Sequence, residues 1–196
     1  MAVLDIQVLG SPILRRETQP VQQMTPELRK LVSDMFDTMY AARGIGLAAP
    51  QVGRSERIAV VDLEKNPITL INPVVTTRAG RSRREEGCLS IPDIHYEVER
   101  AARVTVQALD IDMQPITLEG TDLFSACLQH EIDHLHGKLF LDYLSILKRR
   151  QAMREWDEQR DDFPDFIRRL TPDVIARLKA EDEEAGESEQ HHADSL

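Results

Sequence analysis

The pattern HEIDH at residues 130–134 lies inside a segment whose apolar residues follow helical spacing. Positions four apart are just over one helical turn apart, so the imidazoles of His130 and His134 project from one face and can bind one metal ion. Glu131 stands beside them, where a carboxylate can transfer protons. Burying these polar side chains in an apolar helix is costly unless they have partners. We therefore predict that segment 121–137 is a buried helix carrying a metal site; two ordinary helix histidines are the alternative.

A hydrolytic metal site needs three protein ligands and an open position for water. A histidine six residues after His134, as in HExxHxxGxxH, is excluded because Phe140 stands there. Glu155 stays open as a third ligand, since some zinc peptidases recruit a glutamate about twenty residues further along. Cys88 also stays open, because a glycine precedes it in the motif EGCLS and lets the backbone approach a metal closely.

Cys127 is a weaker ligand candidate than Cys88. It precedes His134 by seven residues on the same helix, roughly 10 Å along the axis, which is too far for both to share one ion comfortably. We expect Cys127 to be a small buried residue on the floor of the site. Two cysteines cannot form a disulfide framework and are typical of a reduced compartment.

The rest of the chain predicts an α+β fold, with antiparallel strands packed around the central HExxH helix and a helical C-terminal extension. Thr25 and Pro26 begin an amphipathic helix that Gly44 follows. We expect strands at 57–63, 68–75, 95–100 and 104–111, and further helices over 146–160 and from Thr171.

Length and charge suggest one compact catalytic domain with two C-terminal additions. We expect a catalytic domain over residues 1–145, a helical extension over 146–180 and an acidic, disordered tail over 181–196. The net charge is −10, and the tail alone holds seven of the 34 acidic residues and no Lys or Arg. This balance argues against general nucleic-acid binding, DNA included. No segment resembles a membrane span, a signal peptide or a transit peptide, so we expect a cytoplasmic protein.

The motif GIGLAAPQ at residues 44–51 is predicted to form an unusual loop directly after the first helix, because two glycines and a proline restrict its backbone. The amide of Gln51 at its end can donate a hydrogen bond to an oxyanion that develops during a reaction. An ordinary helix-to-strand connection is the alternative.

Together, GIGLAAPQ, EGCLS and QHEIDHLHG occur in the order and at the spacings of the peptide deformylases, which this chain resembles over residues 5–145. The resemblance implies that Cys88, His130 and His134 bind one divalent metal ion per chain. Fe(II) is the native ion it suggests, with Zn(II), Ni(II) or Co(II) as alternatives. It makes Glu131 the general acid and base, assigns the oxyanion contacts to Gln51 and the backbone amide of Leu89, and gives Gly46 a backbone contact to substrate.

The activity that the resemblance implies is hydrolysis of the N-formyl group from the formylmethionine of newly synthesised polypeptides, releasing formate. Positions that match the methionine pocket are Ile45, Leu123 and Cys127. Arg84 and His95 depart from some family members at the pocket rim, which leaves peptide affinity open.

Formylmethionyl nascent peptides are the partners that the resemblance implies, and we expect a monomer that contacts the ribosome transiently. The phosphate contacts would be Lys148, Arg149, Arg150 and Arg154, although the acidic tail opposes tight binding. Two other hypotheses stay open: a zinc endopeptidase that uses Glu155, and a ribosome-associated binding module whose metal is only structural.

Overall fold

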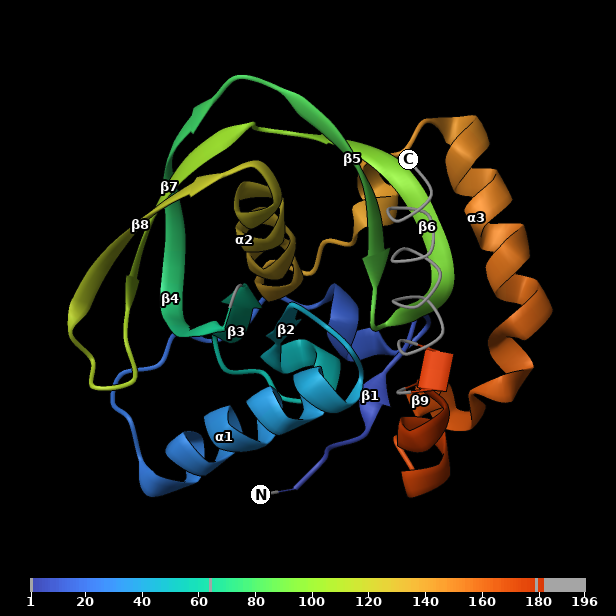
Figure 1. Ribbon diagram of the computed structural model, residues 1–196, viewed down its shortest axis with the longest axis horizontal. Helices are drawn as coiled ribbons and strands as arrows, with labels where there is room; N and C mark the ends of the chain where they lie inside the picture. The colour runs from blue at the N-terminus through green and yellow to red at the C-terminus, as the bar shows by residue number, and fades with distance from the viewer. Residues whose placement is uncertain (1, 64, 179, 182–196) are drawn as a thin grey trace, which may run out of the picture.

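The computed structural model describes residues 2–63, 65–178 and 180–181, and the helices and strands named below belong to those residues (Figure 1). The helices are α1 (Pro26–Ala41), α2 (Asp122–Leu135) and α3 (Ile146–Gln159). The strands are β1 (Ile6–Gln7), β2 (Gly46–Ala48), β3 (Ile58–Leu63), β4 (Asn66–Ala79), β5 (Ser82–Cys88), β6 (Ile91–Arg100), β7 (Arg103–Leu109), β8 (Pro115–Thr121) and β9 (Ile167–Arg168). Among these helices, none is long and apolar enough to cross a membrane.

Three antiparallel sheets form the strand layer. Five strands pair in the order β2-β3-β4-β7-β8, β5 pairs with β6, and β1 pairs with β9. Register shifts in the β4–β7 pairing mark irregularities in that ladder, and such bulges bend a strand. The strands arch around α2 in Figure 1, with α1 below and α3 on the far flank of β6.

Strand β3 links the two helices that flank it, because its successive side chains point to opposite faces. Ala59 and Val61 belong to the buried cluster that includes Leu128 and Leu135 of α2. Ile58 and Val60 belong instead to the cluster that includes α1 residues Val32, Met35 and Met39. These four side chains of β3 are fully buried. The sheet is therefore covered on both faces at this strand, and α2 packs tightly against it.

Local chemistry explains the C-terminal end of α2 but not its N-terminal end. Thr121 occupies the N-cap position without a side-chain capping bond, and Asp122 adopts φ +51° at the first helical position. Gly137 lies just beyond the helix with φ +67°, a conformation that costs glycine little. A Cβ there would lie 2.7 Å from the Arg15 carbonyl carbon, so both the positive φ and the close contact favour glycine at this position.

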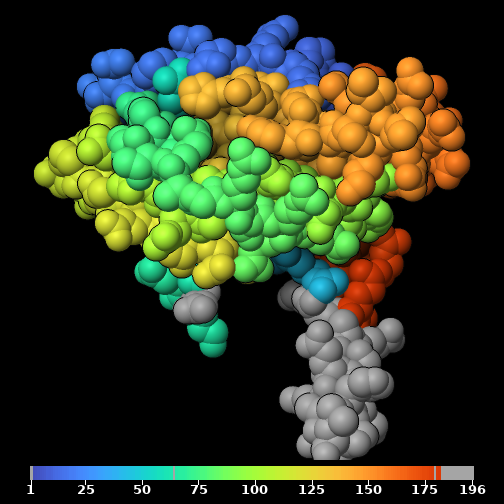
Figure 2. Space-filling view, turned by 90° about the horizontal axis from the view of Figure 1, so that it is seen from above, coloured from blue at the N-terminus to red at the C-terminus, as the bar shows by residue number. Residues whose placement is uncertain are grey.

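Helix α3 packs through Ala152 and Trp156, which are buried beside Ile94 and Val98 of β6. The chain then returns to pair β9 with β1, so that Arg168 stands opposite Ile6. Residues 172–178 are helical. Figure 2 shows this red C-terminal segment below the orange α3.

The predicted mixture of helices and antiparallel strands is confirmed, and the predicted starts at Pro26 and Ile146 match α1 and α3. Five strands were missed: the short strands β1, β2 and β9, together with β5, whose sequence is mostly charged, and β8, which is largely exposed. The predicted loop at 44–51 is wrong in part, because β2 and a 3₁₀ turn, Ala49–Val52, occupy it. The acidic tail was predicted to be disordered over residues 181–196. Glu181 is helical instead, and residues 182–196 lie outside the described residues.

Candidate metal centre and active site

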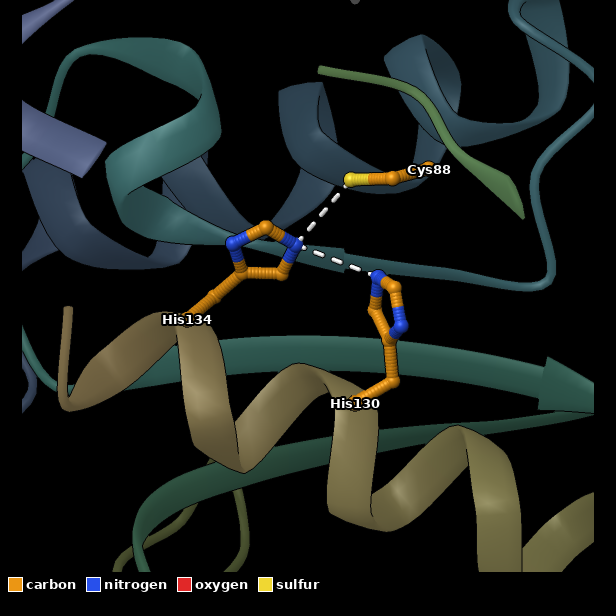
Figure 3. Close-up of side chains that lie close together, drawn as sticks. All are labelled: Cys88, His130 and His134. Atoms are coloured by element: carbon orange, nitrogen blue, oxygen red, sulfur yellow. Dashed lines mark hydrogen bonds between the residues drawn. The ribbon is translucent and has the colours of Figure 1, made fainter. Parts of the chain in front are cut away.

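Three side chains from two distant segments meet at one point (Figure 3). His134 Nε2 lies 3.2 Å from Cys88 Sγ and 3.2 Å from His130 Nε2. The three donor atoms all lie within 4.8 Å of one another. A tetrahedral ion with bonds of about 2.0–2.3 Å to such ligands separates them by roughly 3.3–3.6 Å. The donors are therefore spaced closely enough for one metal ion, and a thiolate with two imidazoles is a suitable ligand set for it.

The fold positions these donors from two directions. His130 and His134 lie one turn apart on α2, as the HEIDH spacing predicts. Cys88 is the last residue of β5 and pairs with Ile91 of β6 across a register shift. The tight connection through Leu89 and Ser90 thus presents the thiol to the helix.

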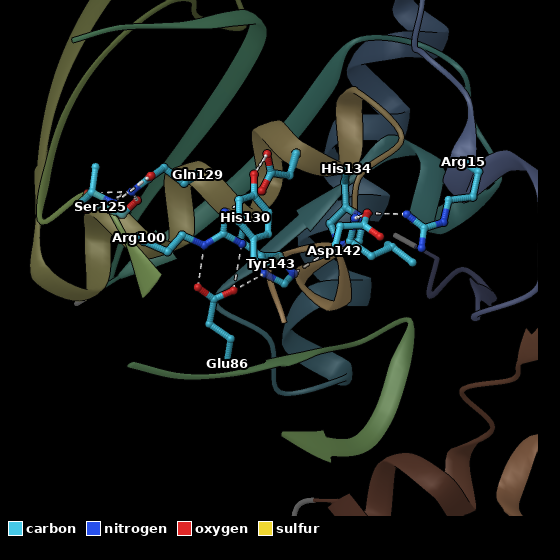
Figure 4. Close-up of polar contacts among 12 residues, drawn as sticks. Arg15, Glu86, Arg100, Ser125, Gln129, His130, His134, Asp142 and Tyr143 are labelled. Atoms are coloured by element: carbon cyan, nitrogen blue, oxygen red, sulfur yellow. Dashed lines mark hydrogen bonds and ion pairs between the residues drawn. The ribbon is translucent and has the colours of Figure 1, made fainter. Parts of the chain in front are cut away.

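A buried ionic network fixes the orientation of His130 (Figure 4). Its Nδ1 lies 3.0 Å from Glu86 Oε2, leaving Nε2 for the metal site. Arg100 donates to both Glu86 oxygens, at 2.6 and 2.9 Å, and to Asp133 Oδ2 at 2.5 Å. The Arg100 guanidinium also lies 4.6 Å from the centre of the Tyr143 ring. Such a partner on the second imidazole nitrogen fixes the tautomer of a metal-binding histidine.

Burial alone would raise the pKa of Glu86, but the hydrogen bonds from His130 and Arg100 outweigh it and lower the pKa to about 2. Burial opposes the charge of Arg100, yet its carboxylate partners raise its pKa above the usual value. Both groups are therefore charged at neutral pH, despite side-chain exposures of only 8% and 4%.

Glu131 lies in the same cleft and is only 4% exposed. Its Oε2 is buried and has no hydrogen-bond partner among the described residues. The buried Nδ1 of His134 likewise has no partner among them. Burial raises the pKa of Glu131 to about 7, against the opposing charges of His130 and Arg100. A buried carboxyl group with an unpartnered oxygen is suited to transferring a proton.

Gly46 leaves the room that Glu131 occupies. A Cβ at position 46 would lie 2.3 Å from Glu131 Oε1, which no side chain could tolerate without moving the carboxylate. Gly44 similarly accommodates the Leu89 side chain, whose Cδ1 would lie 2.7 Å from a Cβ there. The two glycines of GIGLAAPQ are therefore required by close packing, a reason that the sequence pattern did not supply.

Gln51 is 1% exposed and lines the cleft. Its Oε1 accepts from the Ala48 N–H at 2.8 Å, which fixes the amide. Its Nε2 then faces Ser90 Oγ at 3.2 Å and Cys88 Sγ at 3.6 Å. An amide held in this way presents N–H donors beside the candidate metal ligands.

The cleft has a volume of about 520 Å³ and brings together every residue predicted to bind substrate. Cys127 is buried there, and its Sγ donates to the Ile45 carbonyl at 3.6 Å. Ile45 and Leu123 are 43% and 46% exposed and line the cleft, so their apolar surfaces are accessible to a ligand there. Leu89 and Gly46 complete the predicted set along the same cleft.

Other sequence candidates occupy distinct positions. Arg84 and His95 line the cleft rim, where Arg84 pairs with Asp122 at 3.3 Å. Glu155, the alternative third ligand, instead accepts from the Tyr96 hydroxyl at 2.8 Å and is absent from the ligand cluster. His136 lies outside the ligand cluster, is 38% exposed and contacts Glu17 at 2.7 Å.

The sequence reasoning missed Glu86 and Arg100. Glu86 is the first residue of EGCLS, two positions before Cys88 on the same strand, so alternation along β5 could have hinted at it. Arg100 comes from the far end of β6, opposite Ser82, and no sequence signal connects it to the metal site.

Comparison with known proteins gives a consistent result. The polypeptide deformylase family matches residues 3–150. A peptide deformylase of Alkalilimnicola ehrlichii is 48% identical over 162 residues, which are 81% of this chain and 91% of that protein. The crystal structure of a peptide deformylase from Legionella pneumophila superposes with a TM-score of 0.79 at 46% identity, covering 82% of this chain and 96% of that one.

A peptide deformylase from Ehrlichia chaffeensis in complex with actinonin is similar at 36% identity and a TM-score of 0.78, covering 81% of this chain and 98% of that one.

Proposed function

This chain belongs to the polypeptide deformylase family, which removes the formyl group from N-terminal methionine, and from that premise we propose how its own residues perform the reaction. The observation that carries the proposal is the convergence of one thiol and two imidazoles beside a buried glutamate in an apolar-walled cleft. The helix on which this site is built is α2, which we propose as the centre of a catalytic unit spanning residues 1–145.

Cys88, His130 and His134 would hold one divalent metal ion. Such an ion lowers the pKa of a bound water and polarises a carbonyl group. We propose Fe(II) as the native ion because the family resemblance suggests it, with Zn(II), Ni(II) and Co(II) able to use the same donors. Metal analysis of anaerobically purified protein tests this, and a different stoichiometric metal would contradict it.

Glu131 moves the protons. Its unpartnered Oε2 can accept the proton of the attacking water, and the same carboxyl group can return that proton to the amine that leaves. Gly46 leaves the space in the cleft that this carboxylate occupies.

Gln51 and the backbone N–H of Leu89 stabilise the developing oxyanion. The Gln51 amide is held by Ala48 and points its Nε2 toward Cys88, so its donors are oriented before substrate arrives. Preorganised donors of this kind stabilise the transition state because they need no rearrangement during the reaction.

The apolar wall selects the methionine side chain. Ile45, Leu123 and Cys127 present carbon and sulfur surfaces next to His130 and Glu131. With its unbranched side chain in this pocket, a formylmethionine residue would have its N-formyl group at the metal ligands. The Gly46 backbone would pair with the peptide.

The test is formate release from N-formyl-Met-Ala-Ser, with metal content measured on the same samples. Wild type should release formate, whereas Glu131→Gln should bind metal and release none. Cys88→Ala should lose the metal, and Glu155→Gln should keep both metal and activity. Formate from the Glu131→Gln variant at the wild-type rate, or metal loss from Glu155→Gln, would refute these assignments.

We also propose that the protein works as a cytoplasmic monomer and contacts the ribosome transiently through basic residues of α3. Deleting the helix would remove Trp156, which is 3% exposed in the core, so charge reversal is the cleaner test. Arg150→Glu with Arg154→Glu should weaken cosedimentation with ribosomes and leave short-peptide turnover unchanged. Unchanged cosedimentation would refute the contact, and light scattering tests the monomer.

A further inference from the structure

The part of the chain that follows α3 contributes to the substrate cleft. The family match ends at residue 150, yet Arg168, Leu178 and Glu181 line the same cleft as Cys88 and Glu131. A segment outside the matched region therefore forms part of the wall around the candidate active site.

This wall is held in place by backbone pairing and apolar packing. Strand β9 pairs with β1, with Arg168 opposite Ile6. Leu170 and Leu178 are buried in one cluster with Ile6 and Ala42. The segment is thus built into the fold beside the cleft.

The same cluster reaches the residue proposed to contact the oxyanion. Leu89 packs its side chain against the buried cluster that contains Leu170 and Leu178. Peptide residues that extend from the metal ligands past Leu89 would therefore meet residues 167–178 and Glu181.

Arg168 is the unusual side chain on this wall. It is half-buried and lines the cleft, yet its guanidinium makes no hydrogen bond or ion pair within the part of the chain that the structure describes. Two other cleft arginines have carboxylate partners: Arg84 pairs with Asp122 at 3.3 Å and Arg43 with Glu181 at 3.8 Å.

The charges around Arg168 come from several elements. Asp93 at the start of β6, Arg177 and Glu181 act on it electrostatically. None lies within ion-pair distance, so its five N–H donors have room for an acceptor that a ligand brings. A carboxylate is the acceptor that matches a guanidinium best.

We propose that residues 167–178, together with Glu181, form an added wall of the peptide-binding cleft, and that Arg168 on this wall binds an acidic side chain in one of the two residues after the formylmethionine. This inference rests on the deformylase activity proposed above. It makes Arg168 a specificity determinant that acts on the peptide and has no part in the chemical step.

The experiment compares kcat/KM for four amidated peptides: N-formyl-Met-Ala-Glu, N-formyl-Met-Ala-Lys, N-formyl-Met-Glu-Ala and N-formyl-Met-Lys-Ala. Amidation removes the terminal carboxylate, which would otherwise compete for the arginine. The wild type should prefer glutamate over lysine at one of the two positions by about three- to fivefold, as expected for a partly exposed charge pair.

Arg168→Gln should abolish this preference, and Arg168→Glu should reverse it. Arg169→Gln is the matched control, because Arg169 is exposed and does not line the cleft, and it should keep the wild-type ratio. Inhibition by the deformylated peptides Met-Ala-Glu-amide and Met-Glu-Ala-amide, compared with their lysine counterparts, should change in parallel and reports binding alone.

Each remaining result has a definite meaning. Equal ratios in wild type and Arg168→Gln, or equal changes in the Arg168→Gln and Arg169→Gln variants, would overturn the inference while formate release continues. Absence of formate from every peptide and variant would instead refute the proposed function. Removing residues 182–196 only should leave the ratio unchanged, and a changed ratio there would assign the preference to the tail.

Discussion

Replacing Arg100 with methionine should be among the most damaging changes near the site, although Arg100 is not a proposed ligand. Its guanidinium is 4% exposed and neutralises Glu86 and Asp133, which are 8% and 15% exposed. Removing one partner of a buried ion pair costs about 3–5 kcal/mol because the remaining charge stays buried. Glu86 keeps His130, and Asp133 keeps the Tyr143 hydroxyl at 2.9 Å, which places the expected loss near the lower end of that range, at about 3 kcal/mol.

Urea unfolding of metal-free protein measures this loss without a contribution from metal binding. The matched control is Arg83→Met, because Arg83 pairs with Glu99 at 3.1 Å where the two side chains are 65% and 39% exposed. Exposed pairs contribute at most about 1 kcal/mol. A loss below about 1 kcal/mol for Arg100→Met would refute the account of the buried network.

The network should also affect metal binding. Without Arg100, Glu86 is a weaker anchor for His130 Nδ1, and losing such an outer partner lowers metal affinity by about 10–100-fold. Competition with a chelator measures that change. Unaltered affinity would show that α2 alone orients His130, and the Glu86 contact would then have no part in holding the ligand.

Three further predictions concern other parts of the molecule. Gly46→Ala should reduce kcat by about tenfold or more with the metal still bound, because its Cβ would displace the Glu131 carboxylate; formate assays on the metal-loaded variant check this. Trp156→Ala should cost about 3–5 kcal/mol in the free energy of unfolding, since its 3% exposed ring would leave a cavity. The third prediction concerns Asp142: burial alone would raise the pKa of its carboxyl group, but the hydrogen bond from Arg15 outweighs burial and lowers that pKa below 3.8. Its stabilisation is therefore present above about pH 3.8 and lost as the pH falls through the lower folded value; Asp142→Asn should flatten the fall in stability over that range.

The sequence predicted those elements whose pattern reflects one buried face. Helices α1 and α2 have apolar residues at helical spacing, and Gly137 ends α2 where its punctuation indicates. Strand β5 was not predicted because its buried side chains are not apolar. Glu86 is buried there because Arg100 forms an ion pair with it. A buried carboxylate on a strand looks like a surface residue until its partner is known, and that partner comes from another strand.

The site divides along the same physical line. Spacing within one helix is a local property, so the sequence alone could predict that His130, Glu131 and His134 lie together. Cys88 was assigned to the same site only through the family resemblance, because its distance from the histidines depends on the turn between β5 and β6. The steric role of Gly46 needs the distance to Glu131, which only the packed structure gives. Arg168 is the extreme case: its chain neighbours Arg169 and Ile167 give no sign of a cleft, and it reaches one because β9 pairs with β1 at the opposite end of the chain. The position of Arg168 in the cleft is therefore set by long-range strand pairing. Arg168 and Arg169 have identical chemistry, yet they should differ in their effect on the substrate.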